Sequence, residues 1–176
     1  MKKVLFILMP KDYQEREFNK PYQQLTAAGH TVDVAGLQPG NAIGHQGATF
    51  TPNKLLIEMT EQDFASYDAL VITGGPGSTT YLWNNELIKK TIRFFHDHGK
   101  LVATICYACI AAVQAGILKN KCATVYPTDE AKAILVQHQV TFVQDGCVVL
   151  EQEKIITGQG PQFANDFAQA IIKILG

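Results

Sequence analysis

The chain has 176 residues, of which 47% are hydrophobic and 18% are charged, and its formal net charge is −1. This length fits one domain, and we expect residues 1–176 to form it. Because the lysines and arginines form no cluster beyond short pairs, a nucleic-acid or anionic-membrane partner is disfavoured. The apolar run at residues 4–9 is too short for a signal peptide or a membrane span.

The predicted elements alternate between strands and helices along the chain. Continuous apolar runs predict strands that are buried on both faces, and apolar residues at the helical period predict amphipathic helices. In chain order we expect a strand at 3–9, a helix at 15–28, a strand at 30–37, loops and short extended pieces over 38–60, a strand at 68–73, a glycine turn at 74–78, a helix at 84–98, a strand at 100–105, a helix at 107–115, a short helix, strand pieces near 139–150 and 154–157, and a last helix at 162–174. This alternation predicts an α/β fold with a mostly parallel sheet wound on both faces.

Cys106 stands where a predicted strand passes directly into a predicted helix. Ligands of an open α/β sheet bind beyond the carboxyl ends of its strands, and a helix N-terminus favours an anion. Both effects favour the thiolate, which is the nucleophilic form, so we expect a lowered pKa for this thiol. The small residues Ala103, Ala108 and Ala111 suit a tight turn of the kind that carries a nucleophile.

Two further segments are expected at the same edge of the sheet. The backbone N–H groups of Gly74 and Gly75 are suited to an oxyanion hole, although a plain tight turn is the alternative. Glu15 and Glu17 follow the first predicted strand, and a carboxyl near a thiolate is pushed toward its protonated form. A solvated carboxylate at the helix start is the better interpretation of Glu15, whereas spacing alone leaves Glu17 open.

The remaining cysteines and histidines point to ordinary structural roles. Cys106 and Cys109 form a C-x-x-C pair at a helix start, as in thioredoxins, but the tight turn would strain a disulfide, and we favour a small buried residue for Cys109. The four cysteines follow no export signal, so we expect reduced thiols and a cytoplasmic protein. The five histidines are scattered, so we expect no metal site and place them at the surface or at helix caps. They are His30, His45, His96, His98 and His138.

Several motifs are spread along nearly the whole chain: Glu17 four residues before Pro21, "LVITGGPGS", "ATICYAC", Tyr126–Pro127 and "IITGQGPQFANDFAQAII". Together they resemble the DJ-1/PfpI family, and the last is similar to the DJ-1 side of that family. The resemblance implies a flavodoxin-like, doubly wound sheet with helices on both faces, usually in a homodimer, and no cofactor is expected. It implies that Cys106 is the reactive thiol and that Glu17 is a protonated carboxyl bonded to its sulfur. It also implies an oxyanion pocket formed by Gly75 and the backbone N–H of Tyr107.

The resemblance further implies one of several activities: glutathione-independent conversion of methylglyoxal to lactate, deglycation, proteolysis, or chaperone and redox-sensing roles. Two departures bear on the choice. Tyr107 stands where protease-like members have a histidine, and Tyr126 stands where DJ-1 has one. Since a phenol is no efficient base at neutral pH, these departures weaken a peptidase most. A glutamine amidotransferase is set aside, because the late segment "KIITGQGPQF" contains no histidine.

We therefore expect a glyoxalase III- or deglycase-type enzyme that acts on small reactive aldehydes through a hemithioacetal on Cys106. In this hypothesis Glu17 moves the proton at carbon and Tyr126 holds a substrate oxygen. One alternative is a redox-sensing or stress-protective protein in which Cys106 oxidises to a sulfinate without turnover. The other alternative is a cysteine peptidase or amidase.

Overall fold

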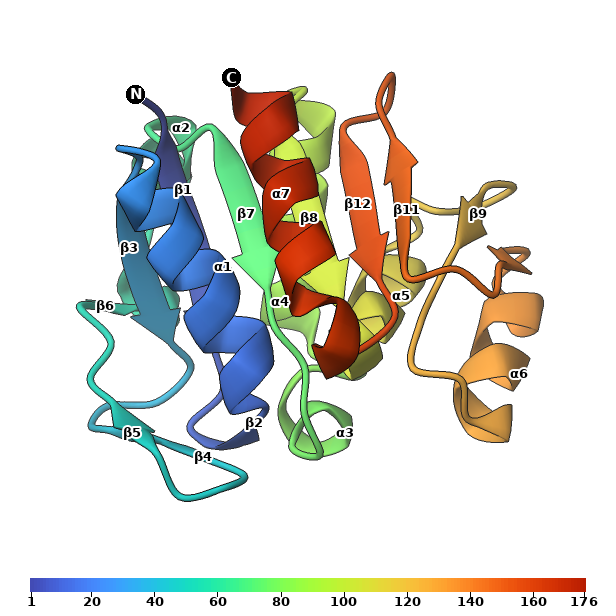
Figure 1. The fold of residues 1–176 in the computed structure, drawn as a ribbon, viewed down its shortest axis with the longest axis horizontal. Helices are drawn as coiled ribbons and strands as arrows, with labels where there is room; N and C mark the ends of the chain where they lie inside the picture. The colour runs from blue at the N-terminus through green and yellow to red at the C-terminus, as the bar shows by residue number, and fades with distance from the viewer.

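A seven-stranded sheet forms the centre of the computed structural model, which describes residues 1–176 (Figure 1). The strand order is β11-β12-β8-β7-β1-β3-β6. Neighbouring strands are parallel, except that β11 runs antiparallel to β12 at one edge. The strands are β1 Lys3–Leu8, β3 Thr31–Gly36, β6 Lys54–Leu55, β7 Ala69–Ile72, β8 Leu101–Ile105, β11 Cys147–Leu150 and β12 Ile155–Gly158.

Helices cover both faces of this sheet, so its central strands β7 and β8 are buried along their whole length. On one face α1 (Glu15–Ala27) lies beside α7 (Ala164–Leu175), and on the other α4 (Glu86–Asp97) lies beside α5 (Cys109–Ala115) (Figure 1). A strand that is covered twice needs an apolar residue at nearly every position, which explains the continuous runs in the sequence. The predicted α/β fold with a mostly parallel, doubly wound sheet is confirmed.

Local signals account for where the helices begin. The Gln14 side chain caps α1 by accepting from the N–H groups of Arg16 and Glu17, and Asn85 caps α4 in the same way. The structure also contains two helices that periodicity did not predict, α2 (Glu61–Ala65) and α3 (Ser78–Tyr81). Both are too short to display an apolar face in the sequence.

The helix predicted at 107–115 has a different start. A 3-10 turn over Cys106–Ala108 precedes α5, which begins at Cys109 and ends at Ala115, with Gly116 as its C-cap. α6 (Asp129–Gln137) is the short helix expected after residue 127, and β9 (Cys122–Ala123) pairs with β10 (Thr141–Phe142) beside it. None of the helices is both long and apolar enough to cross a lipid bilayer.

A small second sheet lies at the carboxyl edge of β1. It consists of β2 (Lys11–Tyr13), β4 (Ala42–Gly44) and β5 (Thr49–Phe50). β4 runs parallel to β2 and antiparallel to β5, so residues 42–50 form a hairpin held against the segment that follows β1. The prediction of loops and short extended pieces over 38–60 is confirmed, and the hairpin is the part of that region that reaches the site described next.

Candidate active site

Cys106 occupies a strained turn at the end of β8. Its backbone φ is 61°, in the left-handed region that costs a non-glycine residue about 1–3 kcal/mol. The chain passes directly from the strand into the 3-10 segment at this residue. The sequence predicted such a tight strand-to-helix turn at Cys106. Cys106 is only 5% exposed, and it lines a pocket of about 240 Å³. The fold therefore holds a thiol at the base of an opening to solvent.

Glu17, on the first turn of α1, is completely buried next to this thiol. Its Oε2 accepts a hydrogen bond from the N–H of Gly74 at 2.9 Å. The other oxygen, Oε1, has no nitrogen or oxygen partner, and the Cys106 thiol lies beside the carboxyl. Burial raises the pKa of Glu17 to about 7, although the hydrogen bonds with Cys106 and Gly74 act in the opposite direction. A large share of the molecules therefore hold this carboxyl in its neutral form near neutral pH.

The Cys106 thiol itself is not predisposed to ionise in the resting site. Burial raises its pKa and the charge of Glu17 raises it further, whereas a hydrogen bond from the backbone N–H of Tyr107 lowers it. The expectation of a lowered thiol pKa was wrong, because the sulfur is desolvated and α5 begins only at Cys109. The thiol and the carboxyl compete for one negative charge and titrate as a pair.

The two glycines of the predicted oxyanion hole have different roles. The N–H of Gly74 already donates to Glu17, and Gly74 does not line the pocket, so the prediction that it binds a substrate oxygen was wrong. Gly75 does line the pocket, and its N–H makes no hydrogen bond within the protein. Its φ of 134° and the carbonyl of Asp12, 2.5 Å from where a Cβ would stand, exclude any other residue. At the pocket the N–H of Gly75 is therefore free, whereas the N–H of Tyr107 already donates to the Cys106 sulfur.

Aromatic side chains form part of the pocket wall. Tyr107 and Tyr126 both line it, with ring centroids 5.3 Å apart. Trp83 packs edge-on against Tyr107, and its indole N–H donates to the Tyr107 carbonyl at 2.9 Å. Tyr126 is 41% exposed, so part of this pocket residue is open to solvent. The structure thus brings Cys106, Tyr107 and Tyr126 to one pocket, as the sequence predicted.

The sequence placed His45 at the surface, where it is exposed, but it predicted neither the position of His45 at the pocket nor the burial of Glu15. His45 lies in the turn between β4 and β5 and lines the pocket with Cys106. Glu15 is only 7% exposed, and its Oε1 accepts from the N–H of Gln46 at 2.6 Å. The interpretation of Glu15 as a solvated carboxylate was wrong, because the hairpin folds over the start of α1. The only local signal in the sequence is a pair of glycines, Gly44 and Gly47, which predicts a turn. It does not indicate which residues that turn packs against.

The other predicted cysteine and histidine roles are mostly confirmed. Cys109 is completely buried, its sulfur faces the Gly158 carbonyl at 3.5 Å, and all four cysteines are free thiols. His98 and His138 follow α4 and α6 as capping residues. His30 was wrongly placed at the surface: it is 7% exposed, and its Nδ1 accepts from the N–H of Lys2. No group of three histidine, cysteine or acidic residues is arranged to hold a metal ion.

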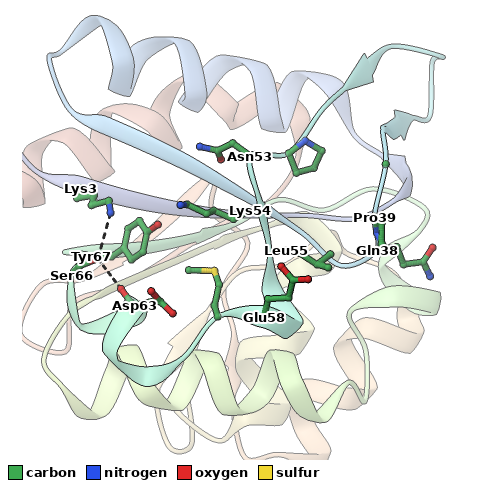
Figure 2. Close-up of a pocket in the computed structure, with 13 residues that line it drawn as sticks. Lys3, Gln38, Pro39, Asn53, Lys54, Leu55, Glu58, Asp63, Ser66 and Tyr67 are labelled. Atoms are coloured by element: carbon green, nitrogen blue, oxygen red, sulfur yellow. Dashed lines mark hydrogen bonds between the residues drawn. The ribbon is translucent and has the colours of Figure 1, made fainter.

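A larger hollow of about 480 Å³ lies at the β6 edge of the sheet (Figure 2). Lys3 and Tyr67 line one end of it, where the Lys3 ammonium donates to the Ser66 hydroxyl at 3.4 Å. It shares no residue with the Cys106 pocket and is lined by no cysteine or histidine. Its lining contains two lysines, Lys3 and Lys54, and two acidic residues, Glu58 and Asp63, so it carries no net charge, and it contains no thiol. The smaller pocket is therefore the candidate active site.

Known proteins share this fold and about a quarter to a third of this sequence. The family model for the DJ-1/PfpI family matches residues 2–174. An uncharacterised protein of Methanocaldococcus jannaschii is 34% identical over 173 residues, which cover 98% of this chain and 82% of that protein. Protein/nucleic acid deglycase 2 of Escherichia coli is 26% identical over 100% of this chain and 99% of its own length. The crystal structure of Drosophila melanogaster DJ-1beta superimposes with a TM-score of 0.83 at 30% identity, over 98% of this chain and 89% of that one.

Proposed function

The chain belongs to the DJ-1/PfpI family, and from that premise we propose that it is an enzyme that uses Cys106 to attack small reactive aldehydes or the adducts they form. The observation that carries the proposal is the strained Cys106, paired with the buried Glu17 and open to a pocket. The relative named deglycase in Escherichia coli supports an enzyme of this general type.

In the first step the Cys106 sulfur adds to the aldehyde carbon. The thiol proton passes to Glu17, whose raised pKa suits it to hold a proton near neutral pH. The carbonyl oxygen becomes the hemithioacetal oxygen, and its negative charge is met by the N–H groups of Gly75 and Tyr107. Burial of the sulfur keeps the thiol neutral until substrate arrives, and a neutral thiol is protected from unproductive reactions.

For methylglyoxal the following steps balance without an external oxidant. Glu17 first gives the thiol proton to the hemithioacetal oxygen, and its carboxylate then takes the hydrogen of the former aldehyde carbon as a proton. Glu17 returns this proton to the neighbouring ketone carbon, while the hydroxyl proton on the first carbon passes to the ketone oxygen. The first carbon is thereby oxidised to a thioester and the second is reduced to an alcohol, with Tyr126 holding the alcohol oxygen. Water then hydrolyses the thioester, which releases lactate and restores the Cys106 thiol.

The size of the pocket agrees with this substrate class. A water molecule takes up about 30 Å³ of the liquid, so a pocket of about 240 Å³ has room for a three-carbon aldehyde together with water. A folded or extended peptide needs a longer groove. The peptidase alternative is further weakened by Tyr107, because a neighbouring imidazole is what activates the thiol of a cysteine peptidase.

Lactate production from methylglyoxal, without glutathione, tests the proposal. We expect turnover by the wild type and none by Cys106→Ser. Cys122→Ser is the matched control, because this half-buried thiol lies outside the pocket, and it should keep full activity. Glycated amino acids serve as a second substrate set. Absence of product from both substrates with a correctly folded wild type would overturn the proposal.

A redox-sensing role is a second candidate, favoured by the neutral Glu17 beside the sulfur. A protonated carboxyl can donate a hydrogen bond to one sulfinate oxygen. The N–H groups of Gly75 and Tyr107 can donate hydrogen bonds to the other negatively charged oxygen. Peroxide titration followed by intact mass measurement tests it. Rapid addition of two oxygen atoms at Cys106, in a protein that forms no lactate, would favour this candidate over the enzyme.

The family resemblance also underlies our proposal that residues 1–176 form one domain that assembles as a homodimer in the cytoplasm. The chain has a mass of 19.3 kDa, so sedimentation velocity at micromolar concentration separates a monomer from a dimer. A species of monomer mass at all concentrations would contradict the assembly and would leave the chemistry at Cys106 unaffected.

A further inference from the structure

Hydrolysis of a thioester needs a group that removes a proton from water. Among the residues that line the pocket, the ionisable side chains are those of Cys106, Tyr107, Tyr126 and His45. During hydrolysis the sulfur is bonded to the substrate, and a phenol keeps its proton at neutral pH. Glu17 is completely buried and does not line the pocket, so it reaches the atoms next to the sulfur and not the solvent side. Imidazole, the usual base at neutral pH, is present only in His45.

The fold holds the backbone around His45 against the loop that joins β1 to α1. The N–H of His45 donates to the carbonyl of Tyr13 at 2.8 Å. The next N–H, that of Gln46, donates to the buried carboxyl of Glu15 at 2.6 Å. Within the hairpin, the N–H of Gly44 donates to the carbonyl of Ala48 at 2.7 Å. Consecutive main-chain bonds therefore fix the position from which this imidazole projects.

The same loop is also tied to the base of the site. The N–H of Gln14, itself a pocket residue, donates to the carbonyl of Gly74 at 2.8 Å, and Gly74 in turn bonds Glu17. The hairpin, the loop and the glycine turn are thus joined by hydrogen bonds into one frame. A residue on this frame keeps its place relative to Cys106.

We propose that His45 is a catalytic residue that acts as the general base for hydrolysis of the Cys106 thioester, an inference that rests on the proposed function. His45 removes one proton from a water molecule in the pocket, and the oxygen attacks the thioester carbonyl. The tetrahedral intermediate then expels the Cys106 sulfur as a thiolate, the proton that His45 took from water returns to this sulfur, and the acid is released. His45 supplies the imidazole that is missing at positions 107 and 126, from a different element of the fold.

The test follows methylglyoxal and lactate in the wild type, in His45→Gln and in His138→Gln. His138 is the control, because it caps α6 outside the pocket. We expect His45→Gln to lower steady-state lactate formation by about 100-fold or more and His138→Gln to leave it unchanged. His45→Gln should still consume one methylglyoxal per Cys106 in a rapid first phase. Hydroxylamine should then release a hydroxamate of lactate, because it cleaves thioesters without a base from the protein.

The outcomes separate this inference from the proposed function. Lactate formation by His45→Gln at the wild-type rate would overturn the role of His45 and leave the enzyme proposal intact. Loss of the rapid phase together with turnover would also overturn it, since His45 would then act before the thioester forms. A wild type that forms no lactate would overturn both. Equal rates of Cys106 alkylation by iodoacetamide in the wild type and His45→Gln would support a role after nucleophilic attack.

Discussion

Replacing Glu17 with glutamine is expected to stabilise the folded protein above neutral pH and to flatten its pH dependence. Glutamine has nearly the same shape, and its oxygen can still accept the hydrogen bond from the N–H of Gly74, which is 2.9 Å from the Glu17 carboxyl. The substitution therefore removes one property, the ability of the buried group to become charged.

The magnitude follows from the pKa of the carboxyl in the two states. Burial raises the pKa of Glu17 from its ordinary value of 4.5 to about 7. Below pH 4.5 both the folded and the unfolded chain hold the proton, and the group has no net effect. Between pH 4.5 and 7 the unfolded chain releases its proton first, so the free energy of unfolding falls as the pH rises. One pKa unit corresponds to about 1.4 kcal/mol, so the full loss is about 3 kcal/mol.

Urea unfolding followed by circular dichroism at pH 5, 6, 7 and 8 measures this effect, at fixed protein concentration and with reducing agent present. Between pH 5 and pH 8 the wild type should lose roughly 2–3 kcal/mol more than Glu17→Gln. Glu61→Gln, at an exposed position in the first turn of α2, is the matched control and should follow the wild type. If the curves of wild type and Glu17→Gln run parallel, the buried carboxyl does not titrate as we argue.

Three further substitutions test the backbone and the pocket wall. Cys106→Gly should be more stable than Cys106→Ala by about 1 kcal/mol, because glycine adopts the φ of 61° without strain; equal melting temperatures would contradict a strained turn. Gly75→Ala should destabilise the fold by about 2 kcal/mol or more and abolish lactate formation, since its Cβ would stand 2.5 Å from the Asp12 carbonyl; a fully active variant would exclude the role of Gly75. Trp83→Phe should cost about 1 kcal/mol in urea unfolding through loss of the hydrogen bond to Tyr107, and an unchanged midpoint would show that this bond contributes nothing.

Local patterns were sufficient to predict the parts of the site that follow directly from strand ends. The apolar run that becomes β8 passes without a break into Cys106, and β7 passes into the glycine turn. The carboxyl ends of parallel strands meet at one edge of the sheet, so these patterns alone predicted that Cys106 and Gly75 lie together. The place of Tyr107 at the pocket was implied by the family resemblance and not by these local patterns.

Only the tertiary structure decided which groups are buried and what their neighbours are. Glu15 and Glu17 look alike in the sequence, but Glu15 is covered by the hairpin, whereas Glu17 faces the thiol. Desolvation depends on contacts from distant segments, so no local pattern showed that burial raises the pKa of Cys106. The position of His45 depends in the same way on the pairing of β2 with β4, about thirty residues apart along the chain. The sequence by itself thus determined the α/β fold and the position of the thiol at a strand end. Long-range packing determined the protonation state of that thiol and the residues that surround it.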